Sequence, residues 1–197
     1  MLTREQLLKI FRTTKALQRG HFELASGLHS GHYFQCAQFL QYPELASKVC
    51  RELAHRFAAK KPTVVIGPAI GGIIVSYEIA KVLGVRAVYA ERVDAEMQLR
   101  RGFSVGPKDR AVIVEDVITT GESARKVGEL VEALGAKVLG VGVVVDRSGG
   151  SVRFTRRWKY ERLFVLDFGS FKPHLCPLCD ERVPLTHPGS RHKKTAA

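Results

Sequence analysis

Residues 112–123 read Val112-Ile113-Val114-Glu115-Asp116-Val117-Ile118-Thr119-Thr120-Gly121-Glu122-Ser123. The leading apolar residues are typical of a buried strand, which runs directly into two adjacent carboxylates. A turn with two hydroxyls and a glycine follows, and then the start of a helix. In an open α/β sheet, ligands bind beyond the carboxyl ends of the strands, where a helix N-terminus offers N–H groups and a positive dipole end. The stretch therefore predicts a phosphate-binding turn beside two carboxylates suited to the hydroxyls of a ribose.

The alternative for this stretch is a capped helix after an ordinary strand, with both carboxylates in solvent. The carboxylates, however, join the strand to the turn without a break, which favours the binding site. The chain has no Gly-x-x-x-x-Gly-Lys-Ser/Thr, as in a P-loop, and no Gly-x-Gly-x-x-Gly after a strand, as in a dinucleotide site. The segment therefore predicts a different kind of phosphate site.

Apolar runs and helical stripes alternate along most of the chain. Strands are predicted over residues 63–67, 85–90, 111–114, 138–145 and 163–166, and helices over residues 3–19, from Pro43, and near 72–83 and 122–134. This alternation predicts an α/β fold, in which a mostly parallel twisted sheet carries helices on both faces. We expect one domain over residues 1–197, with residues 1–42 as a small N-terminal hood and residues 170–197 as a C-terminal tail.

The composition is that of an ordinary globular protein with a basic surface. The 197 residues include 31 Lys and Arg against 19 Asp and Glu, a net charge of +12. The basic residues are scattered in short clusters, so we expect neither a nucleic-acid-binding tail nor a membrane-binding surface. Two explanations of the positive charge remain: binding of anionic small substrates, or a basic surface that is simply solvated. No apolar run is long enough to span a bilayer, and the N-terminus lacks a signal-peptide core. We therefore expect a cytoplasmic protein.

Two further segments carry candidate functional residues. Residues 92–109 are polar and charged and long enough for a functional, mobile loop. The pair Cys176-x-x-Cys179 supplies half of a zinc site and needs two more donors, for which His174 and His187 are nearest in sequence. Reduced thiols without a metal are the alternative, and both interpretations stay open.

Six stretches, taken in order, resemble the orotate phosphoribosyltransferases, a branch of the type I phosphoribosyltransferases. Residues 112–123 resemble the phosphoribosyl-pyrophosphate motif of that family. The other stretches resemble its orotate-side segment, pyrophosphate loop, mobile loop, late orotate-contacting strand end and tail, and they are His21–Ser30 with Tyr33-Phe34, Gly67–Gly72, Leu99–Phe103, Asp146–Gly150 and Pro188–Arg191. The resemblance implies an enzyme, a glycosyltransferase (pentosyltransferase), that makes orotidine 5′-phosphate and pyrophosphate in pyrimidine (UMP) biosynthesis.

The resemblance also implies roles for individual residues. Asp116, Glu115, Arg92 and Arg100 become the catalytic candidates. Phosphoribosyl pyrophosphate would be bound by Glu115, Asp116, Val117, Ile118, Thr119, Thr120, Gly121, Glu122, Ser123, Ala69, Ile70, Gly71, Gly72, Arg92, Arg100 and Arg101. Orotate would be bound by Thr119, Arg147, Tyr33 and Phe34. The implied cofactor is Mg²⁺ carried by the substrate, with no metal site on the protein, and the implied assembly is a homodimer whose loop reaches the other subunit's site.

The chain departs from the family pattern at its cations. A Lys-x-x-Lys-x-His pattern common in the mobile loop is absent, and Arg92 lies where it would begin. Gly71 and Ala25 stand where lysines often occur. We therefore expect Arg92, Arg100 and Arg101 to serve the pyrophosphate, ahead of Lys81 or Lys108.

Two alternative functions remain at this point. A phosphoribosyltransferase for another base would share residues 112–123 but not residues 21–34 or Arg147. A non-catalytic regulator that binds nucleic acid would need a reading element, and no helix-turn-helix or similar motif is present.

Overall fold

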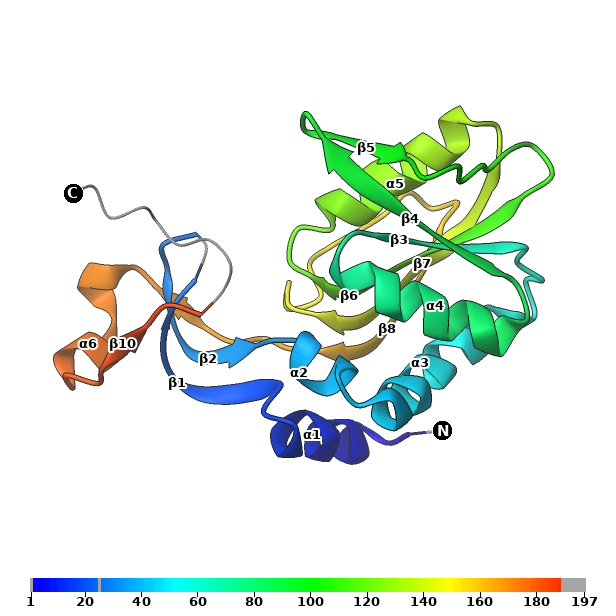
Figure 1. Ribbon diagram of the computed structural model, residues 1–197. Coiled ribbons are helices and arrows are strands. Elements are labelled where there is room, and N and C mark those ends of the chain that lie inside the picture. The colour runs from blue at the N-terminus through cyan, green and yellow to red at the C-terminus, as the bar shows by residue number, and fades with distance from the viewer. Residues whose placement is uncertain (1, 25, 189–197) are drawn as a thin grey trace.

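The structure is a computed structural model that describes residues 2–24 and 26–188. Its body is a six-stranded sheet of order β5-β4-β3-β6-β7-β8 (Figure 1). The strands are β3 (Val64–Pro68), β4 (Arg86–Val93), β5 (Glu96–Leu99), β6 (Arg110–Ile118), β7 (Lys137–Asp146) and β8 (Lys159–Val165). Every neighbouring pair is parallel except β4 with β5. The predicted α/β fold with a mostly parallel sheet is confirmed.

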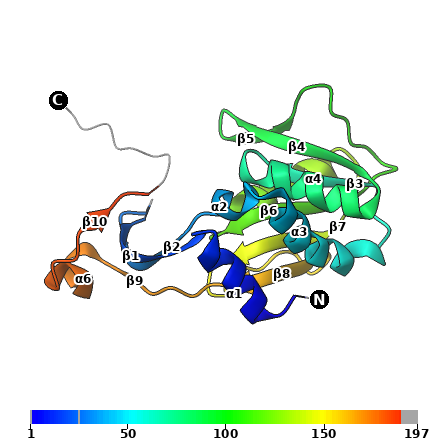
Figure 2. The ribbon, with the colours of Figure 1, turned by 60° about the horizontal axis from the view of Figure 1, so that its bottom comes forward.

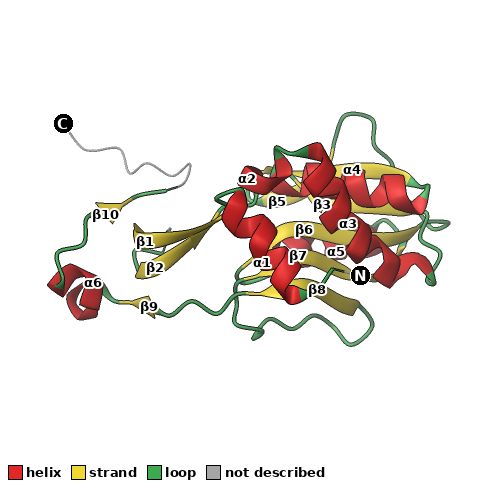
Figure 3. Cartoon of the chain, turned by 90° about the horizontal axis from the view of Figure 1, so that it is seen from below, coloured by secondary structure: helices red, strands yellow, loops and turns green. Residues whose placement is uncertain are grey.

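Helices cover both faces of this sheet. Helices α1 (Arg4–Thr13), α3 (Pro43–Ala58) and α4 (Gly71–Leu83) lie on one face, and α5 (Glu122–Ala133) lies on the other (Figure 3). Side chains of β6 alternate between the two cores: Val112 and Val114 pack with the first group of helices, and Ala111 and Ile113 pack with α5. None of the helices in the described ranges is both long and apolar enough to cross a membrane.

A second, smaller sheet stands beside the body (Figures 1 and 2). Its order is β10-β1-β2-β9, with β1 (Leu17–Glu23), β2 (His29–Phe34), β9 (Ser170–Phe171) and β10 (Leu185–Thr186). A 3-10 turn (Pro173–Leu175) and the short helix α6 (Pro177–Asp180) connect β9 to β10, and α2 (Ala37–Leu40) follows β2. Strands β1 and β2 form an antiparallel hairpin, and Gly27 in its turn takes a positive φ of 79°. The C-terminal tail forms both edges of this small sheet.

The first helix is shorter than predicted. Thr3 and Gln6 form a capping box at its start, but the helix ends at Thr13 rather than at residue 19. Lys15 has a left-handed φ of 57°, and Leu17, which fits the apolar stripe of a helix, begins β1. The prediction from apolar spacing alone therefore placed the end of the helix too late in the chain.

The predicted loop over residues 92–109 is partly a hairpin. Strand β4 continues to Val93, the turn residues Asp94 and Ala95 have φ of 47° and 70°, and β5 returns along β4. Apart from that turn, residues 100–109 lack regular structure within the segment. The strand predicted over 111–114 likewise continues to Ile118, so Glu115 and Asp116 lie inside β6 rather than after it.

Candidate active site

The carboxyl ends of β3, β6 and β7 lie at one edge of the body sheet. They lead into residues 69–72, 119–121 and 147–150, which hold most of the predicted site. The backbone N–H of Arg147 donates a hydrogen bond to the carbonyl of Ile118 over 2.8 Å, which ties the turn after β7 to the end of β6. The parallel register therefore brings Thr119 and Arg147 together from separate parts of the chain.

The turn after β6 has free donors at the start of α5. Gly121 is buried with a φ of 73°, and a Cβ there would lie 2.9 Å from Val152 Cγ1, so the position requires glycine. No side chain caps α5, and the N–H of Glu122 lies 3.4 Å from Thr120 Oγ1. Thr119 and Thr120 are exposed. This helix start can accept a phosphate through backbone N–H groups and hydroxyls.

The two carboxylates of β6 have different surroundings. Asp116 lies against the start of α4, where a Cβ on Gly71 would come within 2.4 Å of its Oδ2 atom. The thiol of Cys36 contacts the carbonyl oxygen of Asp116 at 3.6 Å. Glu115, which precedes Asp116 on β6, points to the opposite face of the sheet and lies near Arg92. Glycine at position 71 therefore leaves room for the Asp116 carboxylate in the orientation that the structure shows.

Electrostatics at this edge favour the neutral form of both acids. Burial, together with the charge of Asp116, raises the pKa of Glu115 to about 8, and Arg92 opposes this rise. Burial also raises the pKa of Asp116. Arg92 extends from the end of β4, with its Nη1 atom 4.0 Å from the Glu122 carboxylate. The site is therefore suited to hydrogen-bond donors and cations, which stabilise the ionised carboxylates.

The turn after β7 holds Arg147 on a rigid support. The preceding residue, Asp146, is fully buried and accepts hydrogen bonds from the Ser148 N–H at 2.8 Å and from the Tyr160 hydroxyl at 3.0 Å. Arg162 pairs with the same carboxylate at 3.3 Å. Burial lowers the pKa of Arg147, and the nearby Tyr33 phenol raises it. Among the described residues no carboxylate forms an ion pair with Arg147, so its guanidinium is available to an anionic ligand.

The structure brings Tyr33 to Arg147 but not Phe34. Tyr33 is partly exposed, and its ring lies 5.7 Å from that of Phe22. Phe34 is only 3% exposed and packs edge-on against Phe11 at 5.0 Å. Because neighbouring strand residues face opposite ways, the expectation that the Phe34 side chain also flanks a base is corrected: that side chain belongs to the core. Ala25 lies outside the described residues.

Comparison with known proteins gives the family. The phosphoribosyl transferase domain family matches residues 36–160. Orotate phosphoribosyltransferases from Pelotomaculum thermopropionicum and Desulforamulus reducens are 52% and 50% identical over 190 residues, 96% of this chain and 99% and 98% of those proteins. The chain belongs to the orotate phosphoribosyltransferase family.

Solved structures show the same fold. The crystal structure of orotate phosphoribosyltransferase from Aeropyrum pernix aligns with a TM-score of 0.69 at 26% identity, over 81% of this chain and 93% of that one. Adenine phosphoribosyltransferase from Leishmania tarentolae aligns with a TM-score of 0.62 at 19% identity, over 83% and 89% of the two chains. The second likeness shows a shared fold alone, so the preference of an orotate phosphoribosyltransferase for its base must come from the site.

The loop arginines of this chain lie away from the two carboxylates of β6. Arg101 Nε is 2.7 Å and Arg100 Nη1 is 3.3 Å from the carboxylate of Glu91. Both arginines lower the pKa of Glu91 through hydrogen bonds and charge. Glu91 and Arg92 are adjacent on β4 and point to opposite faces. The structure therefore assembles Arg92 with the predicted site but not Arg100 or Arg101.

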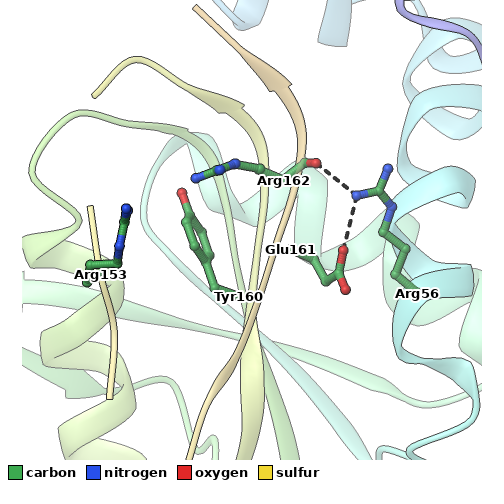
Figure 4. Close-up of a pocket in the computed structure, with 5 residues that line it drawn as sticks. All are labelled: Arg56, Arg153, Tyr160, Glu161 and Arg162. Atoms are coloured by element: carbon green, nitrogen blue, oxygen red, sulfur yellow. Dashed lines mark hydrogen bonds and ion pairs between the residues drawn. The ribbon is translucent and has the colours of Figure 1, made fainter. Parts of the chain in front are cut away.

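A separate hollow of about 420 Å³ lies along β8 and holds none of the predicted site residues (Figure 4). Its lining residues are Arg56, Arg153, Tyr160, Glu161 and Arg162. Arg56 bonds to the Glu161 carboxylate at 3.1 Å and to the Arg162 carbonyl at 2.8 Å (Figure 4). Tyr160 and Arg162 also bond to Asp146, so this wall supports the turn that carries Arg147.

Three supporting residues escaped the sequence-based prediction. The sequence indicates no role in the site for Cys36, Asp146 or Tyr160. A carboxylate that ends an apolar strand just before an arginine is the one sequence pattern that points to Asp146. Its two partners on β8 follow from the sheet pairing and have no local pattern.

Proposed function

We propose that this chain transfers the phosphoribosyl group of phosphoribosyl pyrophosphate to orotate, giving orotidine 5′-phosphate and pyrophosphate in the synthesis of UMP. One observation carries the choice of base. Arg147, without a carboxylate partner in the described chain, lies next to Thr119 and near Tyr33. A guanidinium fork binds a carboxylate through two parallel hydrogen bonds, and the carboxylate is what distinguishes orotate from uracil.

We infer that the phosphate, the ribose and the pyrophosphate of the other substrate bind to neighbouring segments at this sheet edge. The start of α5, residues 119–123, would bind the 5′-phosphate through N–H and hydroxyl donors. Glu115 and Asp116 would accept hydrogen bonds from the ribose hydroxyls, which favours their ionised forms. Residues 69–72, which begin α4 beside Asp116, would face the pyrophosphate. These three roles are proposals that rest on the common sheet edge.

The chemistry asks for positioning and electrostatics rather than a strong base. Orotate is already an anion, and breaking the bond between ribose C1 and pyrophosphate leaves positive charge on the sugar and negative charge on the leaving group. Carboxylates near the sugar and cations near the pyrophosphate would stabilise these charges. Arg92 is a cation at this edge that lies near Glu115 and Glu122.

We infer that Mg²⁺ enters with phosphoribosyl pyrophosphate. Two partly buried carboxylates with raised pKa values fit a hard cation and the hydroxyls that it binds, because oxygen is the ligand that Mg²⁺ prefers. When bound, the ion would neutralise charge on the pyrophosphate. The protein's own part would be to orient the ribose through Glu115 and Asp116.

We also propose that residues 100–109 act as a lid across a homodimer. A reactive sugar must be kept from water, which gives an arginine-bearing loop a reason to close. Arg100 and Arg101 would leave Glu91 for the pyrophosphate of the neighbouring subunit's site. Their exposed side chains and the solvent-screened ion pairs make that exchange inexpensive.

A panel of bases tests the proposed function. With phosphoribosyl pyrophosphate and Mg²⁺, pyrophosphate release should be fast with orotate and several orders of magnitude slower with uracil, because uracil leaves Arg147 unpaired. Arg147→Ala should lose most orotate turnover, whereas the exposed Arg156→Ala should not. Comparable turnover of uracil, adenine or hypoxanthine by the unmodified protein would contradict the assignment.

A further inference from the structure

Four metal-binding side chains meet beside the small sheet. His21 is on β1, His29 is on β2, and Cys176 and Cys179 flank the start of α6, about 150 residues later in the chain. One ligand atom from each lies within 4.8 Å of all the others. Figures 1 and 2 show α6 at the end of the molecule where β1 and β2 lie. The fold therefore joins two distant segments at these four residues.

Four of the six distances between donor atoms are close to those of a tetrahedral metal site. His21 Nε2 lies 3.0 Å from His29 Nδ1. Cys176 Sγ lies 3.4 Å from His21 Nε2, and Cys179 Sγ lies 3.4 Å from His29 Nδ1 and 3.8 Å from His21 Nε2. A tetrahedral zinc ion with Zn–N of about 2.0–2.1 Å and Zn–S of about 2.3 Å separates two nitrogens by about 3.3–3.4 Å and a nitrogen from a sulfur by about 3.5–3.6 Å. Shifts of a few tenths of an ångström bring these four distances to the tetrahedral values, and the other two pairs lie within 4.8 Å.

The surroundings prepare the donors for a metal. His21 Nδ1 lies 2.8 Å from the carbonyl oxygen of Val183, which can only accept, so Nδ1 carries the proton and Nε2 presents its lone pair to the cluster. The N–H groups of Cys179 and Asp180 both donate to the Cys176 carbonyl, at 3.0 and 3.4 Å, which makes the tight turn of a Cys-x-x-Cys knuckle. All four cysteines of the chain are free thiols.

The tail around the knuckle has almost no apolar core of its own. Among residues 169–188, Cys176 is the one buried residue, at 1% exposure. The edge strands β9 and β10 are two residues long each. A segment this small needs a cross-link to hold one structure, and a metal supplies it when no disulfide is present.

We propose that His21, His29, Cys176 and Cys179 bind one Zn²⁺ ion and that this ion fastens the C-terminal tail to the hood. Two neutral imidazoles and two thiolates balance the charge of the ion, and the two thiol protons pass to solvent on binding. Four protein ligands leave no open position, so the site is structural. The nearer histidines in sequence are not donors: His187 pairs with Glu23 at 2.9 Å, and His174 is exposed outside the cluster.

Metal content of the full-length protein tests this site. Protein purified without chelator should hold about one zinc per chain after dialysis. Cys179→Ser and His29→Ala should each lose that zinc, whereas His174→Gln, altered at the neighbouring exposed histidine, should keep it. Replacement by Co²⁺ should give the intense visible absorption of a tetrahedral thiolate site in the unaltered protein and in His174→Gln alone.

A second measurement keeps the test independent of variant folding. Stripping zinc from the unaltered protein with a strong chelator should expose residues 170–188 to limited proteolysis and lower the melting temperature, and added Zn²⁺, but not Mg²⁺, should reverse both effects. Purified protein without zinc that neither binds added Zn²⁺ nor gains protection from it would overturn the proposal. So would a Cys176–Cys179 disulfide found by mass spectrometry in freshly purified protein.

Discussion

Glu115 is held where its ionised form is disfavoured. Burial and the charge of Asp116 raise its pKa from 4.5 to about 8, so between these values the folded chain binds a proton that the unfolded chain has released. Stability then falls as pH rises through this window, the reverse of the usual carboxylate. The residue that we propose for the ribose therefore destabilises the ligand-free protein at neutral and alkaline pH.

Glu115→Gln should separate stability from activity. Because glutamine does not titrate, the melting temperature of the variant should exceed that of the unaltered protein by a margin that grows from pH 5 to pH 8. Each kcal/mol of added stability should raise the melting temperature by about 2–4 °C. The same variant should lose about 2–4 kcal/mol of transition-state stabilisation in kcat/KM. The exposed Glu129→Gln on α5 is the control. A margin that shrinks as pH rises would contradict the raised pKa.

Gly71 and Asp116 form a contact that one methyl group should disrupt. A Cβ at position 71 would lie 2.4 Å from the Asp116 carboxylate, so Gly71→Ala should turn that carboxylate away from the ribose. A displacement near 1 Å is expected to lower kcat/KM about 10²-fold. Gly169→Ala, outside the site and the proposed lid, where an added Cβ meets only Phe171 Cζ at 4.0 Å, should leave the rate unchanged. Equal rates in the two variants would show that Asp116 is not a positioning contact.

At the scale of elements, the hairpin β4–β5 and the loop after it set where the arginines lie. Arg100 and Arg101 are 56% and 62% exposed, and both pair with Glu91. If the lid must leave Glu91 to reach pyrophosphate, Glu91→Gln should lower the KM for phosphoribosyl pyrophosphate, by up to about 5-fold for an exposed pair. Glu96→Gln on β5 is the matched control. A higher KM in Glu91→Gln would mean that the Glu91 contact holds the arginines in their working position.

The sequence predicted the elements whose stability is local. Buried runs such as residues 64–67 and glycines such as Gly84 and Gly135 mark the body strands and helix ends, and the structure confirms them. Strands β5, β9 and β10 were missed because each is four residues or fewer and forms only against a partner strand. Pairing with a neighbouring strand stabilises these short strands, because their intrinsic propensity for β-structure is not sufficient.

Some features of the candidate site could likewise be predicted from the sequence, and others could not. The common edge of parallel strands follows from topology, so the assembly of Thr119 with Arg147 could be expected from the sequence. The burial of Phe34 against Phe11 and the pairing of Arg100 with Glu91 depend on which face a neighbour occupies, and no local pattern shows this. The histidines nearest in sequence to Cys176 and Cys179 are His174 and His187, whereas the small sheet places His21 of β1 and His29 of β2 beside the two cysteines.

At the scale of the whole molecule, the proposed lid predicts complementation between subunits. Take Arg100→Ala with Arg101→Ala as the lid-defective chain and Asp116→Ala as the pocket-defective chain. Under closed two-fold symmetry, equal amounts give about half mixed dimers with one working site of two, so about a quarter of full activity should return. Co-expression with two affinity tags allows the mixed dimer to be purified, and a rate assay should then give about half of full activity for it and about a quarter for the unsorted mixture. Inactive mixed dimers would show that the loop serves its own subunit.

The small sheet also sets an order of events during synthesis. Strands β1 and β2 leave the ribosome early, but β9 and β10, which pair with β2 and β1, follow the entire body. At about 5–20 residues per second, the interval of about 150 residues between Phe34 and Thr186 lasts roughly 8–30 s. The body sheet can fold in that time, whereas the nascent hairpin waits with two uncovered edges and two unliganded histidines. A chain released before Cys176 would thus contain the candidate active site but would lack the tail that covers β1 and β2. In cells such a chain would be a preferred substrate for chaperones and proteases.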